Sequence, residues 1–126
     1  MIPGLLAFSK SVSPTSDPEF ALLVATGTDV TSHPSMLHGG KVAIFFDEAL
    51  ALHTIVLFPQ GGATLKLVVT YIKPTPSNTT LLFRSWLRKT EGRKLWVEGE
   101  VVTEEGLVTA KADGVFMGFR PNEAKI

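Results

Sequence analysis

Residues 40–57 read GKVAIFFDEALALHTIVL, and their apolar side chains recur every three or four positions. This spacing predicts one long helix from Gly40 or Lys41 to about Leu57. Pro59 and a pair of glycines follow the stretch and would end the helix. The helix is apolar around most of its surface, so we expect it to be buried on several sides.

Alternating and β-branched stretches predict strands on both sides of this helix. One strand precedes it, at Glu19–Thr26. Four strands follow it at regular spacing: Thr64–Lys73, Thr80–Lys89, Lys94–Thr103 and Leu107–Phe119. Small residues on the strand faces, including Gly99 and Gly114, could let a sheet curl around the helix. We therefore predict an α+β fold in which an antiparallel sheet wraps around one long central helix.

Side-chain parity predicts how the second and third strands after the helix pair. Their apolar residues occupy odd positions, so odd residues must stand opposite odd residues across the turn. A loop with an odd number of residues achieves this, and Glu91-Gly92-Arg93 provides a three-residue hairpin loop. The same register sets Arg84 opposite Glu100 on the outer face of the sheet.

The composition excludes several classes of protein. The chain has 126 residues, of which 44% are hydrophobic and 19% charged, which is too apolar for a disordered chain. Its 12 basic and 12 acidic residues cancel, which argues against a general nucleic-acid binder. The chain has no cysteine, and its three histidines are too scattered for a zinc site without carboxylate help. We expect no metal and no redox cofactor.

A chain of this length is expected to form one domain. The predicted bounds are an irregular lead-in at 1–18, the domain at 19–120 and a tail at 121–126. The longest apolar stretch, Val42–Phe58, contains acidic residues, so we expect no membrane-spanning helix. The first residues lack arginine and a basic region. A cytoplasmic location is expected, and a mitochondrial one stays open if a leader has been removed.

The triplet His38-Gly39-Gly40, followed after six residues by Asp47, suggests chemistry. The triplet stands at the predicted helix start, where backbone amides lack partners and carry the positive end of the helix dipole. Glycine lets a ligand approach the backbone closely, so this place suits a polarised carbonyl oxygen. A carboxylate on so apolar a helix is costly unless it is paired or functional. From these residues alone, an Asp47 that merely fixes the core is as plausible as a catalytic one.

The segment HGGKVAIFFDEALA, residues 38–51, resembles the HGG-x6-D signature of hotdog-fold thioesterases. The strand ATLKLVVTYIKPTP and the hairpin LRKTEGRKLWVEGEVV resemble the next elements of that family, in the same order. The likeness covers about residues 20–118 and looks closest to fungal members and the mammalian mitochondrial long-chain acyl-CoA thioesterases. It implies a hotdog fold and hydrolysis of acyl-CoA thioesters in lipid metabolism.

The resemblance also implies roles for particular residues. Asp47 matches the catalytic carboxylate, which acts as general base on a water or as nucleophile. The Gly39 amide matches the donor that polarises the thioester carbonyl, with Gly40 alongside as a substrate contact. Thr64 matches a Ser or Thr that helps to place the acid and the water. His38 would orient the loop.

Helix geometry predicts that the site is shared between two chains. Gly39 and Asp47 are eight residues apart, which is about 12 Å along a helix. A base and a carbonyl donor must both lie within about 3 Å of the reacting atoms, so one helix cannot supply both. A second copy with its helix antiparallel could bring its own Asp47 to this Gly39. The expected partners are a second copy of the chain and, as the resemblance implies, the acyl-CoA substrate. Dimers of the hotdog family that the chain resembles often pair into tetramers.

Other residues are weaker candidates. Lys73, Arg93 and Lys94 could meet the phosphates of CoA, or they could be solvated charges in turns. Phe46 could line the acyl pocket or belong to the core. His53 is expected to be a satisfied core or interface histidine.

Two other functions stay open. His33 precedes Asp47 by fourteen residues, a spacing similar to that of hotdog dehydratases that act on carrier-bound acyl groups, although those enzymes lack HGG. A hotdog protein that binds acyl chains without turning them over is the third reading. Ser32 stands where other thioesterase branches carry an asparagine, so a role attached to that asparagine is in doubt here.

Overall fold

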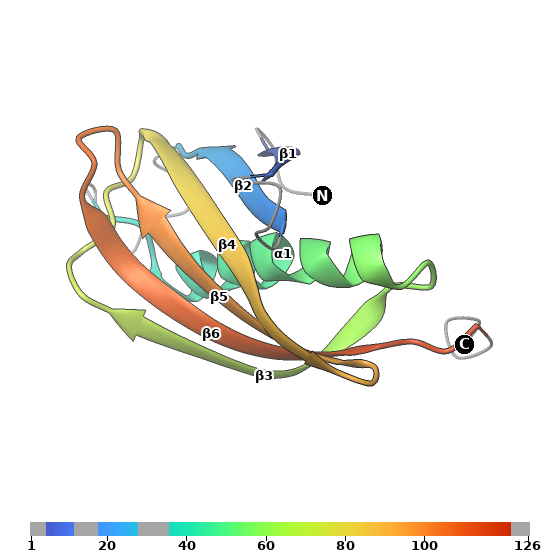
Figure 1. Ribbon diagram of the computed structural model, residues 1–126. Helices are drawn as coiled ribbons and strands as arrows, with labels where there is room; N and C mark the ends of the chain where they lie inside the picture. The colour runs from blue at the N-terminus through green and yellow to red at the C-terminus, as the bar shows by residue number, and fades with distance from the viewer. Residues whose placement is uncertain (1–4, 12–17, 28–35, 122–126) are drawn as a thin grey trace.

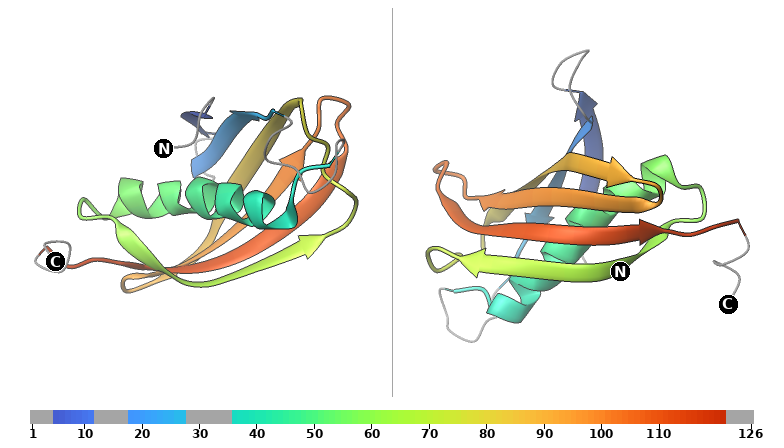
Figure 2. Two further views of the ribbon diagram at one scale, coloured as in Figure 1. Left: turned by 180° about the vertical axis from the view of Figure 1, so that it is seen from behind. Right: turned by 60° about the horizontal axis from the view of Figure 1, so that its bottom comes forward.

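The sheet curves around one long helix (Figures 1 and 2). The computed structural model describes residues 5–11, 18–27 and 36–121. Helix α1 spans Gly39–Leu57. The strands are β1 (Leu5–Ser11), β2 (Pro18–Ala25), β3 (Gly62–Tyr71), β4 (Thr80–Glu91), β5 (Lys94–Val102) and β6 (Val108–Gly118). Neighbours in the sheet run antiparallel in the order β1-β2-β4-β5-β6-β3, so the predicted architecture is confirmed.

Helix α1 has a defined stop signal and one more residue than expected at its start. Its N-cap is His38, whose backbone is extended and whose imidazole accepts a hydrogen bond from the Gly40 amide, so the helix begins at Gly39. At the other end, Phe58 leaves the helical backbone while its amide still donates to the Thr54 carbonyl. Gly61 then takes a φ of 76°, which glycine adopts without strain, and the chain turns into β3.

The expectation that α1 is buried on several sides is not met within one chain. The helix buries the side that faces the sheet, because the sheet wraps only that side. Four of its large apolar residues are between 44% and 61% exposed: Ile44, Ile55, Val56 and Leu57. Exposed apolar side chains in such numbers on one element indicate a surface that another molecule covers.

The predicted irregular lead-in is wrong for part of the first 18 residues. Leu5–Ser11 forms β1, which pairs antiparallel with β2 from Leu5↔Val24 to Ser11↔Pro18. The segment is short and stands between Pro, Gly and Ser, which is why its own pattern did not predict a strand. It becomes one because the outer edge of β2 offers unpaired backbone groups, and pairing satisfies them.

The β4–β5 hairpin has the predicted register and a different turn. Arg84 is paired with Glu100, and their nearest charged atoms are 4.0 Å apart. The expected three-residue loop is wrong, because Glu91 belongs to β4 and only two residues form the turn. A register shift around Arg88 adds one residue to β4, and this bulge restores the parity that the shorter turn would otherwise break.

The core lies between α1 and the concave face of the sheet. Phe46 is fully buried on α1, and its ring meets Phe83 of β4 edge to face at 5.1 Å between centroids. Leu50 is also fully buried and lies over two glycines of the sheet. A Cβ added at Gly99 would stand 2.7 Å from a Leu50 methyl, and one at Gly114 would stand 3.0 Å from the other methyl. The small residues therefore let the helix approach the sheet, as predicted.

Replacing Gly99 by alanine is expected to lower the free energy of unfolding by about 1–3 kcal/mol, because the added methyl overpacks the core. Leu50 has little room to move aside, since its other methyl lies over Gly114, where an added Cβ would stand 3.0 Å from it. Urea denaturation followed by circular dichroism measures the change. The control is Glu105→Ala in the exposed β5–β6 loop, which should leave the midpoint unchanged. A midpoint for Gly99→Ala at or above that of the wild type would contradict this packing.

Within the described ranges, no helix has both the length and the apolar character needed to cross a membrane.

Candidate functional site

At the start of α1, the Gly39 amide has no hydrogen-bond partner among the described residues. The Gly40 amide donates to Nδ1 of His38 at 2.9 Å, and this bond requires Nδ1 to be unprotonated. The next two amides along the helix, of Lys41 and Val42, both donate to the His38 carbonyl. Among the described residues, no hydrogen bond uses the Gly39 amide. The His38 side chain thus holds the Gly40 amide, and within the described part of the chain it is Gly39 whose amide keeps a free donor at the helix terminus.

A β-bulge brings two hydroxyl groups of β3 to the helix side. Thr64 and Tyr71 are seven residues apart, so in a regular strand their side chains would lie on opposite faces. The pairing of β3 with β6 has one extra residue at Leu65. Thr64 is therefore paired with Phe116 and Tyr71 with Ala110, and both partners are buried on the concave face. Bulges commonly re-aim side chains next to functional sites.

Each of these hydroxyl groups bonds to α1. The Thr64 hydroxyl donates to a carboxylate oxygen of Asp47 at 2.7 Å. The Tyr71 hydroxyl donates to the Gly39 carbonyl at 2.6 Å. Asp47 is half-buried, so its second oxygen can still meet a ligand or a water. The contact between Thr64 and Asp47 has the form that the sequence analysis expected, whereas the contact between Tyr71 and Gly39 was not foreseen.

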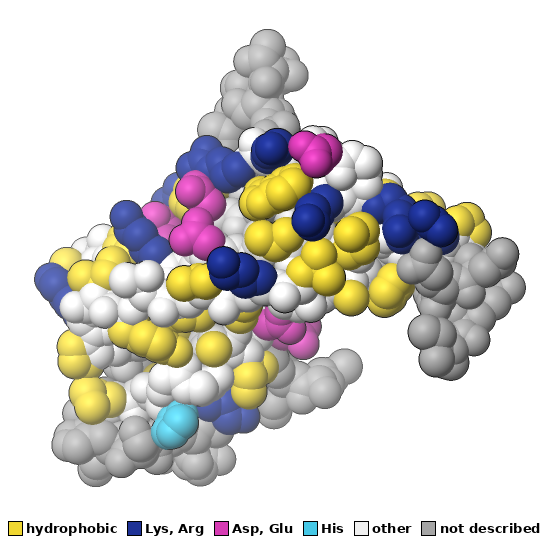
Figure 3. Space-filling view, turned by 90° about the horizontal axis from the view of Figure 1, so that it is seen from below, with side chains coloured by type: hydrophobic (Ala, Val, Ile, Leu, Met, Phe, Trp, Pro, Cys, Tyr) yellow, Lys and Arg dark blue, Asp and Glu magenta, His cyan; other side chains and the backbone are white. Residues whose placement is uncertain are grey.

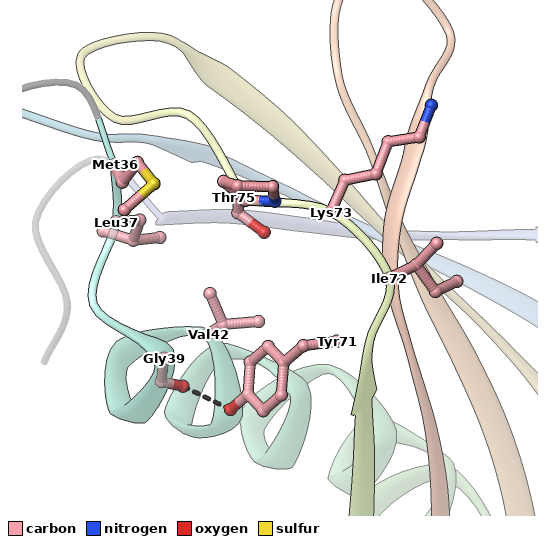
Figure 4. A pocket seen from close by; sticks show the side chains of 9 residues that line it. Met36, Leu37, Gly39, Val42, Tyr71, Ile72, Lys73 and Thr75 are labelled. Carbon is pink, nitrogen blue, oxygen red and sulfur yellow. Dashed lines mark hydrogen bonds between the residues drawn. The ribbon is translucent and has the colours of Figure 1, made fainter.

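A cavity of about 330 Å³ adjoins the start of α1 (Figure 4). Gly39 and Val42 line it from the helix, and Tyr71 and Ile72 line it from the end of β3. Leu37, which precedes the helix, and Thr75 form another wall of the cavity. The Leu37 amide donates a hydrogen bond to the Thr75 carbonyl at 2.8 Å and joins these two segments. The volume is at the lower end of the range for small-molecule sites. The apolar residues at 36, 37, 42 and 72 were missed, since their patterns also fit a plain core.

The three candidate cations do not gather in one chain. Lys73 borders the cavity, and its side chain points away from it (Figure 4). Lys94 is paired with Met117 near the far end of β6, some seven residues from the partner of Tyr71, or about 23 Å along the strand. Arg93 lies in the same hairpin as Lys94 and donates to the Gly118 carbonyl at 2.9 Å. Of these three candidates, Lys73 alone borders the cavity of its own chain.

Two of the other candidates belong to the core. Phe46 is fully buried and does not border the cavity, so in this structure it is a packing residue. His53 is 1% exposed, its Nε2 lies 2.9 Å from the Ser85 hydroxyl, and its ring meets Phe20 edge to face. The prediction of a satisfied core histidine is confirmed. His33 and Ser32 lie outside the described residues.

Among the residues that the structure describes, no three His, Asp or Glu side chains are grouped so that they could hold a metal ion. In one chain these polar groups form two pairs, Thr64 with Asp47 and Tyr71 with Gly39, which stand about 12 Å apart along α1. This set can accept a proton from water and can donate to a carbonyl oxygen.

Comparison with known sequences places the chain among related proteins. The sequence model of the thioesterase superfamily matches residues 35–110. An uncharacterized protein of Schizosaccharomyces pombe is 33% identical over 95 residues, which cover 71% of this chain and 54% of that protein. The acyl-coenzyme A thioesterase THEM4 of Bos taurus is 33% identical over 94 residues, which cover 72% of this chain and 37% of that enzyme. The chain thus spans about half the length of the first relative and less of the second.

A solved structure shares the arrangement of helix and sheet. A Bacillus halodurans protein whose crystal structure was determined with CoA is 26% identical to this chain. The two superpose with a TM-score of 0.70, over 76% of this chain and 68% of the other. The helix and the curved sheet are therefore common to both proteins.

Proposed function

Because the chain belongs to the thioesterase superfamily and has its hotdog fold, we propose that it hydrolyses acyl-CoA thioesters at a site shared by two copies of the chain. The hydrogen bond from Thr64 to Asp47 is the observation that carries the proposal. It orients a half-buried carboxylate through a neutral donor, on a helix whose buried side is mostly apolar. A general base held in this way is the group that hydrolysis of a thioester requires.

In the proposed reaction, Asp47 removes a proton from a water molecule as the water oxygen attacks the thioester carbonyl carbon. The Gly39 amide stabilises the negative charge that develops on the carbonyl oxygen, aided by the positive end of the α1 dipole. The carbon–sulfur bond then breaks, and the leaving thiolate is protonated. The products are the carboxylic acid and free CoA, and no redox step occurs. THEM4, a relative over 72% of this chain, is named an acyl-coenzyme A thioesterase, which supports this substrate class.

The exposed apolar surface of α1 and β3 supports a site made by two copies. β3 ends the sheet, and within the described residues no strand pairs with its outer edge. Large apolar residues of β3 and the segment after it are exposed: Leu65, Val68, Tyr71 and Ile72. Figure 3 views the molecule from the side on which β3 ends the sheet, and exposed apolar side chains are visible there among charged ones. A ten-residue edge strand beside an apolar helix face is suited to pairing with a second copy.

The antiparallel arrangement proposed for two helices fits these exposed residues. If Gly39 of one copy stands opposite Asp47 of the other, the two-fold axis passes near residue 43. Ile44 then lies next to the axis, where it would meet its own counterpart, and it is 47% exposed in the single chain. The cavity beside Gly39 would take the first part of the acyl group, because most of its walls are apolar.

The experiment that tests this function is release of thiol from a panel of acyl-CoAs, from short to long and aromatic, followed with a thiol-reactive dye. The chain has no cysteine, so the protein itself gives no signal in this assay. We expect steady release from at least one acyl-CoA. Absence of release from every acyl-CoA would reject acyl-CoA hydrolysis and leave carrier-bound substrates, dehydration or simple acyl binding.

A further inference from the structure

We propose that Tyr71 is a positioning residue for this reaction: its hydroxyl holds the peptide that follows Gly39, so that the Gly39 amide stays aimed at the substrate carbonyl. The inference rests on the proposed function and adds to it a residue from the edge strand. It is distinct from the Thr64–Asp47 pair, because it concerns the group that binds the carbonyl oxygen and not the base.

Tyr71 contacts Gly39 through both its hydroxyl group and its ring. The Tyr71 hydroxyl donates to the Gly39 carbonyl oxygen at 2.6 Å. The side of the phenol ring also lies against Gly39, because a Cβ built there would stand 3.5 Å from Cε1, Cζ and the hydroxyl oxygen. Figure 4 shows the ring between the helix start and the end of β3, bordering the cavity. The residue therefore touches the turn that carries the free amide.

Both polar groups of the peptide between Gly39 and Gly40 have side-chain partners. Its carbonyl accepts from Tyr71, and its N–H donates to Nδ1 of His38. The preceding amide, on Gly39, is the one that no hydrogen bond among the described residues uses. Consecutive glycines restrain the backbone less than any other pair of residues, so this turn needs restraints from outside. Two side chains supply them, and the Gly39 amide, the proposed catalytic donor, stays without a partner among the residues that the structure describes.

The second restraint comes from the same strand as the partner of Asp47. Tyr71 and Thr64 both reach α1 because the bulge at Leu65 brings them to one face of β3. β3 therefore positions both the donor end and the base end of the helix. In the proposed two-chain site the donor and the base come from different copies, so β3 of each copy holds one of the two groups that act together.

The test is Tyr71→Phe, which removes the hydroxyl and keeps the ring. The matched control is Thr70→Val, which removes a hydroxyl from the opposite face of β3, where Thr70 is exposed and paired with Lys111. With the best acyl-CoA of the panel, Tyr71→Phe should lower kcat by about fivefold to tenfold and change KM by less than about twofold. Thr70→Val should leave both constants unchanged. A normal kcat for Tyr71→Phe in an assay where the wild type is active would overturn the inference.

A second measurement separates this inference from the proposed function. Exchange of the Gly40 amide with water, measured by NMR magnetisation transfer, reports how firmly the turn is held. Tyr71→Phe should speed this exchange by about threefold or more, and Thr70→Val should not. Inactivity of the wild type would count against acyl-CoA hydrolysis while this readout still decides the role of Tyr71. An unchanged Gly40 exchange rate in Tyr71→Phe overturns the positioning role in either case.

Discussion

Replacing Asp47 by asparagine is expected to lower kcat for acyl-CoA hydrolysis by about 100-fold or more, because the variant loses the base that takes the proton from water. Asparagine has nearly the same shape, and its carbonyl oxygen can still accept the hydrogen bond from Thr64. The fold and the placement of the side chain should therefore persist. Thiol release measures the rate, and thermal unfolding checks the fold.

The matched control for this variant is Glu48→Gln. Glu48 is the neighbouring carboxylate, but it is exposed and points about 100° away from Asp47 around the helix. It should keep wild-type rates. Near-normal turnover in a well-folded Asp47→Asn variant would contradict the proposed mechanism. An equal loss of activity in both variants would indicate that the total negative charge near the site matters, and not a specific base.

The elements of the fold followed closely from the residue pattern. The helix was predicted from three- and four-residue spacing, and its end at Leu57 coincides with the Pro and Gly signals that follow. The register that sets Arg84 opposite Glu100 was predicted from parity and a three-residue loop, and the structure reaches it with a two-residue turn and a bulge. These features depend on local periodicity, which a sequence displays directly.

The site depends on features that periodicity does not display. A one-residue bulge at Leu65 decides which side chains of β3 face the helix, and nothing in the letters TLKLVV marks it. The sequence analysis expected Gly40 as a substrate contact alongside Gly39, and it did not foresee that the Gly40 amide donates to His38. The contact between Tyr71 and Gly39 joins residues 32 positions apart, so only the folded sheet reveals it. The edge strand β1 was missed because pairing with β2, not its own pattern, makes it a strand.

Replacing Gly39 by proline should remove the proposed carbonyl donor without disturbing the helix. Proline has no N–H, and it is well tolerated at the first residue of a helix, which is where Gly39 stands. The preceding residue must be extended, and His38 has φ −61° and ψ 136°. The nearest atoms that an added Cβ would meet belong to the Tyr71 side chain, at an ordinary contact distance of 3.5 Å. We expect a loss of about 100-fold to 1,000-fold in kcat with an unchanged helical signal in circular dichroism.

Co-expression of the single variants Gly39→Pro and Asp47→Asn tests whether two chains share the site. When the two single variants are co-expressed in equal amounts, each site draws its amide from one chain and its carboxylate from another. Half of the amides are intact and half of the carboxylates opposite them are intact, so about a quarter of wild-type activity should return. Thiol release by the co-purified protein measures this recovery, and each variant expressed alone provides the baseline. A site contained within one chain cannot recover in this way, because every chain lacks one of the two groups. If the co-expressed protein stays at that baseline rate, then either Gly39 and Asp47 of the same chain act in one site, or one of the two has no role in the reaction.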